Sequence, residues 1–246
     1  LTHCHALTVA SRALETLAWA HGAPPQQVVY VPNGAGIAER ETPNNQPSPA
    51  HLLARSPHIL LYSRLFEFDT GRLVTVLRGV KTAVPTLRIL TVGAGLYDAD
   101  AAQFRQQLAQ ADLLDAVEDA GWVEEEALPA LLRRADVGLY LMEDTLLNRA
   151  KCPVKLADML ALGIPVVGEA VGQVSEYVRH GQTGLLRPSG DTAGLTVDLI
   201  QLLTEPEERA QMARNGRRHY AENFAWPHLA NRLECVYQDG RLETGD

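Results

Sequence analysis

The sequence has few cysteines, an excess of negative charge and no long apolar run, and each feature excludes a class of protein. Its three cysteines, Cys4, Cys152 and Cys235, lie far apart without a Cys-x-x-Cys pair. This spacing argues against a zinc site and a disulfide framework, and it suits a reducing compartment. The formal net charge is -8, so the surface repels nucleic-acid phosphate on average. We expect no nucleic-acid partner.

No apolar run reaches the roughly 20 residues that cross a bilayer, and no secretory signal is visible. We therefore expect a cytoplasmic protein without a transmembrane segment, and leave peripheral contact with a membrane open. The 246 residues, 46% of them hydrophobic, suffice for one large domain or for one domain plus part of another. The sequence starts at Leu1, has its first methionine at Met142 and opens directly into apparent structure. We interpret it as a fragment of a longer protein.

The first 50 residues are organised differently from the rest. Ala6–Ala10 is strand-like, and Ser11 is a candidate cap for a helix over 12–21 that Gly22 ends. VVYVPNG, at 28–34, is an apolar run closed by a turn. The stretch 39–50 holds three prolines and little apolar material, which is typical of a linker. A domain boundary is expected near residue 50.

After the linker, short apolar runs alternate with amphipathic segments. The expected strands are 58–63, 87–93, 116–123, 137–142, 164–169 and 184–188. The expected helices are 70–82, 99–111, 127–134, 153–162, 175–180, 193–203, 207–222 and 227–238, and the acidic run at 124–126 is expected to start the third of them. Such alternation predicts an α/β fold, a Rossmann-like, mostly parallel sheet with helices on both faces. The candidate ligand-binding loops, at the carboxyl ends of strands, follow Ser63, Gly93, Val123, Met142 and Glu169.

The segment KLADMLALGIPVV, at 155–167, is the most informative. It predicts a helix that starts near Pro153, stops at Gly163 and leads into a strand. The amino end of this helix points towards the strand ends, where it attracts anions such as a diphosphate.

This segment resembles the KLxEYLAxGxPVV motif of the group 1 (family 4) glycosyltransferases, which have the GT-B fold. Four further segments match family motifs in the same order: SRL (63–65), TVGAG (91–95), GWVEEEALPALLRRADVGLYL (121–141) and GQVSEYVRHGQTGLL (172–186). VVYVPNG and the closing FAW (224–226) match the inter-domain crossing and the final helix. The similarity covers nearly the whole chain.

The resemblance implies a division into three parts. Residues 1–50 are a remnant of an N-terminal acceptor domain plus a linker, 51–222 form the nucleotide-sugar donor-binding domain, and 223–246 are a C-terminal crossing helix and tail. The N-terminal acceptor domain itself is expected to be missing, so the fragment alone is expected to be inactive. The implied activity is transfer of a hexosyl group from a donor such as a UDP- or GDP-hexose, with retention of anomeric configuration.

The resemblance also implies roles for individual residues. Arg64 and Lys155 stabilise the leaving diphosphate as the catalytic pair, and Asp158 holds the ribose hydroxyls. The other expected donor ligands are Trp122 and Val123 at the base, together with Arg72, Gly93 and Glu176. No metal or other cofactor is required, since cationic side chains and a helix end replace it.

Two positions depart from the family pattern. Asp69 stands where a lysine usually follows the arginine of the first motif, and Ala150 stands where a glutamate contacts the donor sugar. Arg72, Lys151 or Lys155 are candidates to replace the missing lysine. These departures motivate an alternative function, a decayed GT-B domain that acts as a binding or partner subunit. A GT-B epimerase is a weaker alternative, because no set of carboxylates and histidines is evident for it.

Each assignment also has an ordinary structural alternative. Arg64 and Lys155 are also compatible with plain solvated surface positions. Asp158 is also compatible with an ion pair to Lys155 across one helical turn. Trp122 is also compatible with packing in the core or at its rim, Glu176 with the start of a helix, and Gly93 with the formation of a turn.

Overall fold

The computed structural model describes residues 4–37, 56–95 and 97–242. The predicted linker at 39–50 and the expected boundary near residue 50 lie outside these ranges.

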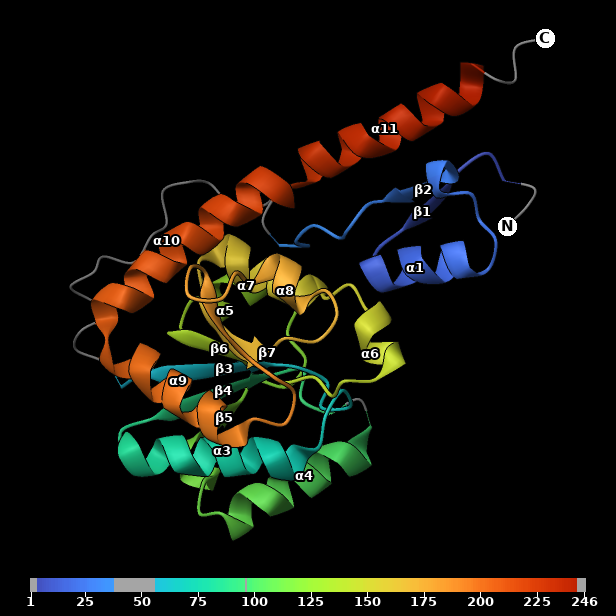
Figure 1. The fold of residues 1–246 in the computed structure, drawn as a ribbon. Coiled ribbons are helices and arrows are strands. Elements are labelled where there is room, and N and C mark those ends of the chain that lie inside the picture. The colour runs from blue at the N-terminus through green and yellow to red at the C-terminus, as the bar shows by residue number, and fades with distance from the viewer. Residues whose placement is uncertain (1–3, 38–55, 96, 243–246) are drawn as a thin grey trace.

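A six-stranded parallel sheet forms the centre of the molecule (Figure 1). Its strands are β3 (His58–Tyr62), β4 (Arg88–Val92), β5 (Val117–Asp119), β6 (Val137–Tyr140), β7 (Val166–Glu169) and β8 (Gly184–Arg187). They lie in the order β5-β4-β3-β6-β7-β8, and every neighbouring pair is parallel. The central strands are apolar along most of their length because helices cover both faces of the sheet. The expected α/β fold is confirmed.

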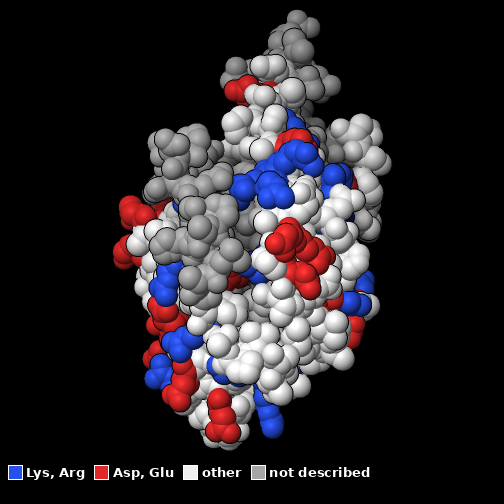
Figure 2. All heavy atoms as spheres, turned by 90° about the vertical axis from the view of Figure 1, so that its left-hand side faces the viewer, with Lys and Arg blue, Asp and Glu red and all other residues white. Residues whose placement is uncertain are grey.

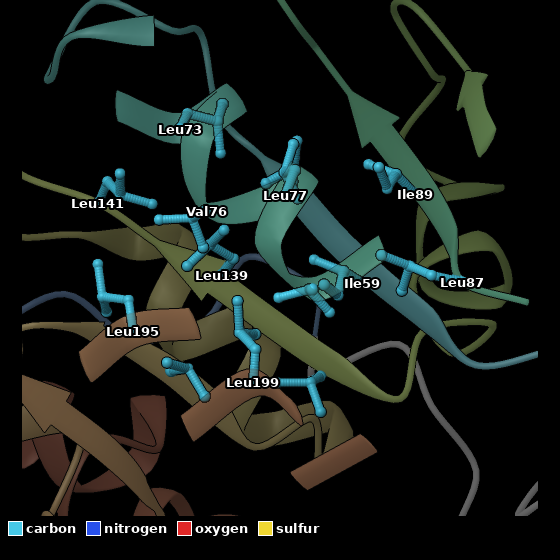
Figure 3. Close-up of a cluster of buried hydrophobic side chains, with 14 of the residues drawn as sticks. Ile59, Leu73, Val76, Leu77, Leu87, Ile89, Leu139, Leu141, Leu195 and Leu199 are labelled. Atoms are coloured by element: carbon cyan, nitrogen blue, oxygen red, sulfur yellow. The ribbon is translucent and has the colours of Figure 1, made fainter. Parts of the chain in front are cut away.

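Helices form a layer on each face of this sheet. One layer contains α3 (Thr70–Ala83), α4 (Asp98–Gln110) and α9 (Thr192–Thr204). Figure 3 shows how its apolar side chains meet those of the strands: Leu73 and Leu77 of α3 and Leu195 and Leu199 of α9 gather around Ile59 and Leu139. All six side chains are buried, and this burial is the main favourable contribution to folding of this layer.

The opposite layer contains α5 (Leu128–Leu132), α7 (Val154–Leu162), α8 (Val174–Tyr177) and α10 (Pro206–Asn223). Helix α7 buries Leu156, Met159 and Leu160 completely, and α10 packs along it. The ring of Tyr177 stacks on that of Phe224 at 4.3 Å between centroids. The helix therefore sits rigidly against the sheet, and its amino end lies at the carboxyl ends of the strands.

A small second unit precedes the main sheet. Its elements are β1 (Leu7–Val9), α1 (Arg12–Ala20), the 3-10 turn η1 (Pro25–Gln27) and β2 (Val28–Tyr30), and the two strands are parallel. The last helix, α11 (Trp226–Leu242), follows α10 after a bend and extends away from the main sheet towards this unit (Figure 1). Trp226, at the start of α11, donates to Ala35 O at 2.9 Å, so this helix begins beside the segment that follows the small unit.

Three elements of the structure differ from what was expected. The strand expected at 116–123 is only β5, because the chain enters a 3-10 turn, η3 (Leu114–Ala116), before it and turns after it at Gly121, whose φ is 58°. The helix expected at 127–134 is the five-residue α5, and the acidic run 124–126 forms the preceding turn rather than its first turn. An unexpected helix, α6 (Leu146–Ala150), begins where the Thr145 hydroxyl accepts a hydrogen bond from Asn148 N at 3.2 Å.

Acidic and basic side chains both occur on the face turned to the viewer in Figure 2, in small groups separated by uncharged surface. Among the described helices, none combines the length and the apolar character that a membrane span requires.

Candidate functional site

The sheet order places a crevice between β3 and β6. The chain winds outward from β3 to β4 and β5 on one side, and from β6 to β7 and β8 on the other. Loops that follow β3 and β6 therefore diverge, and ligands of open α/β sheets bind at such a switch point. A recess of about 10 Å³ opens there, lined by Leu61, Tyr62, Ser63, Glu67, Phe68, Leu139, Tyr140, Leu141 and Lys155. It is the floor of the candidate site.

The loop after β3 presents Arg64 to solvent. Leu65 has a φ of 63°, a left-handed conformation that is unfavourable for a branched side chain. Its N–H donates to Ser63 Oγ at 3.0 Å, and its side chain is buried, which holds the turn in place. Arg64 is exposed, and its guanidinium has no hydrogen-bond or ion-pair partner among the residues that the structure describes.

Lys155 comes from the first turn of α7 and points into the same crevice. Its Nζ lies 4.8 Å from the centroid of the Tyr62 ring. Burial lowers the pKa of Lys155 to about 8, and the nearby positive charge of Arg64 acts in the same direction. Burial also raises the pKa of Tyr62 to about 12. Lys155 and the N-terminus of α7 thus lie at the recess, with Arg64 close enough for its charge to act on Lys155, an arrangement that favours an anion. The structure brings Arg64 and Lys155 together as the sequence predicted.

Asp158 lies one turn further along α7 and is only 3% exposed. Its carboxylate accepts a hydrogen bond from Gly36 N at 2.9 Å, and it also accepts from Ile37 N and the Tyr62 hydroxyl. Burial raises the pKa of Asp158 to about 6, against the opposing effect of these hydrogen bonds. The carboxylate predicted to hold ribose therefore anchors the 31–37 segment here, and its ribose role stays a prediction.

Arg72, a candidate to replace the missing lysine, is engaged within the protein. Its guanidinium forms a two-pronged ion pair with Glu169, which is fully buried at the end of β7. Glu169 also accepts from Met142 N at 2.8 Å and from Gly190 N at 2.6 Å. The pair thus fastens α3 to the loops after β6 and β8, and a buried charge of this kind is stable only with such partners. The predicted contact of Arg72 with the donor stays a prediction, and it would have to share this guanidinium with Glu169.

The predicted base-binding residues lie on the loop after β5. Trp122 is 78% exposed, whereas Val123 packs partly against the core layer around α7. The loop after β4 approaches them, because Gly93 N donates to Gly121 O at 2.8 Å. The φ of Gly93 is 67°, which a residue with a side chain rarely adopts. These residues lie after the carboxyl ends of β4 and β5, and their contact with a base stays a prediction.

Glu176 contributes to the junction with the N-terminal unit. Its carboxylate accepts a hydrogen bond from the Tyr30 hydroxyl at 2.7 Å, while the amide of Gln173 donates to the same hydroxyl. Burial is the main cause that raises the pKa of Tyr30, and the bond to Glu176 adds to it. The predicted contact of Glu176 with a ligand would have to share this carboxylate with Tyr30.

The two departures from the family pattern have local functions. Asp69 is the N-cap of α3, where its carboxylate accepts from Gly71 N at 2.8 Å. The carbonyl oxygen of Ala150 accepts from the Ser11 hydroxyl at 2.8 Å, which joins the first described helix, α1, to the site. Asp69 thus does not provide the cation, and Ala150 does not provide the carboxylate, that the family pattern has at these positions.

The sequence did not single out Glu67 or Asn148. Asn148 is buried on α6, and its amide donates to the backbone oxygens of Glu67 and Glu143 at 3.0 and 2.9 Å. Lys151 Nζ lies 3.6 Å from Glu67 Oε1 and 4.5 Å from the centroid of the Phe66 ring. A signal for Glu67 was present, because it lies in the loop directly after a buried strand.

A larger groove, of about 630 Å³, lies between α4 and the edge of the sheet at β5. Its lining includes Asp98, Asp119 and Arg105, and the last two form an exposed ion pair at 3.7 Å. The groove therefore has acidic rather than cationic character, and the anion-binding geometry belongs to the β3–β6 crevice. No cluster of three or more histidine, cysteine, aspartate or glutamate side chains suited to a metal occurs in the described ranges. That the site works without a metal stays a prediction.

Comparison with known proteins agrees with this geometry. The model of the family described as "Glycosyl transferases group 1" matches residues 51–219. A phosphatidyl-myo-inositol mannosyltransferase of Mycobacterium leprae is 26% identical over 89% of this chain and 56% of its own length. An N-acetyl-alpha-D-glucosaminyl L-malate synthase of Bacillus anthracis is 30% identical over 47% of this chain and 29% of its own length. The chain thus spans about half or less of these relatives.

Solved structures show the same fold. Anabaena HepE in complex with UDP and glucose has a TM-score of 0.77 at 19% identity, with 96% of this chain and 64% of that chain covered. A sucrose-phosphate synthase from Thermosynechococcus elongatus has a TM-score of 0.74 at 22% identity, with 96% and 58% covered. At such identities the likeness concerns the fold alone, and it confirms the expected GT-B, Rossmann-like architecture.

Proposed function

Because the chain belongs to the group 1 glycosyl transferases, we propose that its β3–β6 crevice binds a nucleotide-sugar whose hexosyl group is transferred, with retention, to an acceptor. One observation carries the proposal: Lys155, in the first turn of α7, lines the recess, with Arg64 close enough for its charge to act on it. Such a set of fixed positive groups suits a diphosphate, whose charge grows as the sugar leaves. Arg64 and Lys155 are assigned to that leaving group, and no metal is assigned.

The rest of the donor is arranged around this point. The ribose is assigned to Asp158, and the base to Trp122 and Val123, beside Gly93. The names of relatives support a nucleotide-sugar: HepE was determined with UDP-glucose, and a relative of Corynebacterium glutamicum, 26% identical over 74% of this chain, is a GDP-mannose-dependent mannosyltransferase. Ribose binding requires that the Asp158 carboxylate give up at least one of its hydrogen bonds from Gly36, Ile37 or Tyr62.

Transfer itself is proposed for a longer protein. The chain covers 56% of the M. leprae relative and 64% of the HepE chain. We assign acceptor binding to an N-terminal half that this chain does not contain, and place the reaction in the cytoplasm. On this proposal, the 246 residues bind the donor but do not transfer its sugar.

Calorimetric titration of the folded chain with UDP, GDP and ADP tests donor binding. We expect one of them to bind, and Arg64→Ala to weaken binding by about tenfold to a hundredfold, because a charge-assisted hydrogen bond contributes roughly 1.5–3 kcal/mol. Arg78→Ala is the matched control, since Arg78 is exposed on the outer face of α3, and it should bind as the wild type does. A folded sample that binds none of the three nucleotides contradicts the proposal.

Asp69 and Ala150 support a second candidate function, a GT-B domain that has lost catalysis and serves as a partner subunit. Neither residue provides the charge that the family pattern has at that position. The two functions differ in the full-length protein, when it is incubated with UDP- and GDP-hexoses and a pool of acceptors. Sugar transfer that Arg64→Ala abolishes supports the enzyme, and the absence of transfer with every donor supports the partner subunit.

A further inference from the structure

One carboxylate lines the recess between β3 and β6, that of Glu67. Its side chain is 17% exposed. Its backbone is fixed, because Glu67 O accepts hydrogen bonds from Glu143 N and from the amide of Asn148, both at 3.0 Å. The structure therefore holds this loop, and with it the carboxylate, at a defined place in the crevice.

The side chain of Glu67 keeps most of its capacity to accept hydrogen bonds. Lys151 Nζ is 3.6 Å away, beyond hydrogen-bond distance, and Ser63 Oγ is 3.5 Å away, at the limit of that distance. A carboxylate has about four lone-pair positions. Glu67 is also close enough to Lys155 and Tyr140 for its charge to act on both.

A negative charge at this position opposes the binding of a bare diphosphate, because like charges repel across a partly buried site. The same carboxylate helps a ligand that brings hydroxyl donors next to its phosphates. A nucleotide-sugar is such a ligand, since the hexosyl group directly follows the diphosphate.

The order of the side chains agrees with the order of groups in this ligand. Asp158 lies one turn after Lys155 on α7, beside the 31–37 segment. Glu67 lines the recess together with Lys155 and lies next to Lys151 and α6. With the diphosphate at Lys155 and the ribose towards Asp158, the sugar extends towards Glu67.

We propose that Glu67 is a specificity residue, which accepts hydrogen bonds from hydroxyl groups of the donor hexose. This inference rests on the proposed function. It assigns to the site a carboxylate that recognises the sugar rather than the nucleotide. Glu67 does for the hexose what neither Asp69 nor Ala150 is placed to do.

The test compares a nucleotide with its sugar conjugate on the full chain, by titration of UDP against UDP-glucose and of GDP against GDP-mannose. For whichever pair the wild type binds, Glu67→Ala should weaken the nucleotide-sugar tenfold or more, while the bare nucleotide binds as before or more tightly. Glu67→Gln, which keeps the shape of the side chain and one acceptor, should lose less. Glu143→Ala is the control, since it removes the same charge from an exposed neighbour and should leave both affinities unchanged.

The outcomes separate this inference from the proposed function. If Glu67→Ala weakens the nucleotide and the nucleotide-sugar alike, Glu67 only positions the lysines, and the inference is overturned while donor binding stands. If the variant changes neither affinity, the inference is overturned as well. If the wild type binds no nucleotide at all, the proposed function fails first and the inference fails with it. Near-ultraviolet circular dichroism of each variant verifies that it is folded.

Discussion

Lys155 shows how a single side chain in the crevice is prepared for an anion. Its ammonium group is half-buried beside Tyr62 and has Arg64 nearby, and its pKa is lowered to about 8. A bound diphosphate stabilises the charged form of this lysine. Between pH 7.5 and 9.5, binding must therefore take up a proton, and affinity must fall as the pH rises.

We predict that the affinity for the preferred nucleotide falls above pH 8 by up to about tenfold per pH unit. Lys155→Arg keeps its charge throughout this range, so its affinity should stay nearly constant. Titrations of both proteins at half-unit steps measure the effect. Equal slopes for wild type and variant would show that another group causes the dependence.

At the scale of residues, local motifs predicted where side chains lie, and their ligand roles stay predictions. Arg64 directly follows a strand and Lys155 opens a helix, so the fold alone brings them together. The ion pair of Arg72 was not foreseen, because its partner, Glu169, lies 97 residues away in the chain. Asp158 was identified as a site carboxylate, but its bond to Gly36 spans 122 residues. Local spacing contains no signal for either contact.

Helix α3 begins at one of the positions that depart from the family pattern. The carboxylate of Asp69 accepts from Gly71 N at the start of this helix. Because an N-cap side chain contributes typically about 1 kcal/mol, we expect Asp69→Ala to lower the free energy of unfolding by about that amount. Urea denaturation measures the change, and Asp69→Asn, which still caps, should lose much less.

The same substitution should leave nucleotide binding intact, since Asp69 has no ligand role in the proposal. A large loss of nucleotide affinity in Asp69→Ala, with the stability unchanged, would contradict the capping assignment. Asp69 is thus explained by the helix it starts, and it does not by itself indicate a decayed site.

At the scale of elements, hydrophobic pattern predicted the sheet and most helices, because buried strands and amphipathic helices have distinct periods. The pattern failed for short elements. Helix α6 has five residues, too few for a periodic signal, and it is held by Asn148 and a Thr145 cap. Strand β5 has three residues and pairs only with β4, so its length depends on its neighbour and on the turn at Gly121.

Over the whole molecule, the 31–37 segment joins the N-terminal unit to the main domain. Ala35 N donates to the Tyr220 hydroxyl at 3.1 Å, and Trp226 Nε1 donates to Ala35 O at 2.9 Å. Tyr177 donates to Asn33 O at 2.6 Å. Gly36 completes the set by donating to Asp158. We call the 31–37 segment with these contacts the seam. It connects both ends of the described chain to α7, and hence to the candidate site.

Asp158 makes the stability of this seam depend on pH. Burial raises its pKa to about 6 from an ordinary 3.8, so the native state binds its proton more tightly than the unfolded chain does. The contribution of Asp158 to stability is therefore fully present below pH 3.8 and is lost as the pH rises through about 6. Asp158→Asn has no such titration but still offers Gly36 an acceptor.

We predict that the stability of Asp158→Asn relative to wild type increases between pH 4.5 and 7.5, by an amount on the order of 2 kcal/mol. Urea denaturation of both proteins at several pH values measures this difference, and the other ionisable groups cancel in it. A difference that stays flat across the range would mean that Asp158 is solvated rather than held in the seam.

The seam also gives the molecule an optical property. The three tryptophans of the chain occupy three environments. Trp122 is 78% exposed and Trp19 is 42% exposed. Trp226 is half-buried, and its indole N–H donates to Ala35 O. Emission from Trp226 therefore belongs to the short-wavelength part of the fluorescence spectrum, and emission from Trp122 to the long-wavelength part. A base that stacks on Trp122 quenches the long-wavelength part, while opening of the seam shifts the short-wavelength part to the red. One spectrum thus distinguishes occupation of the crevice from separation of the two units.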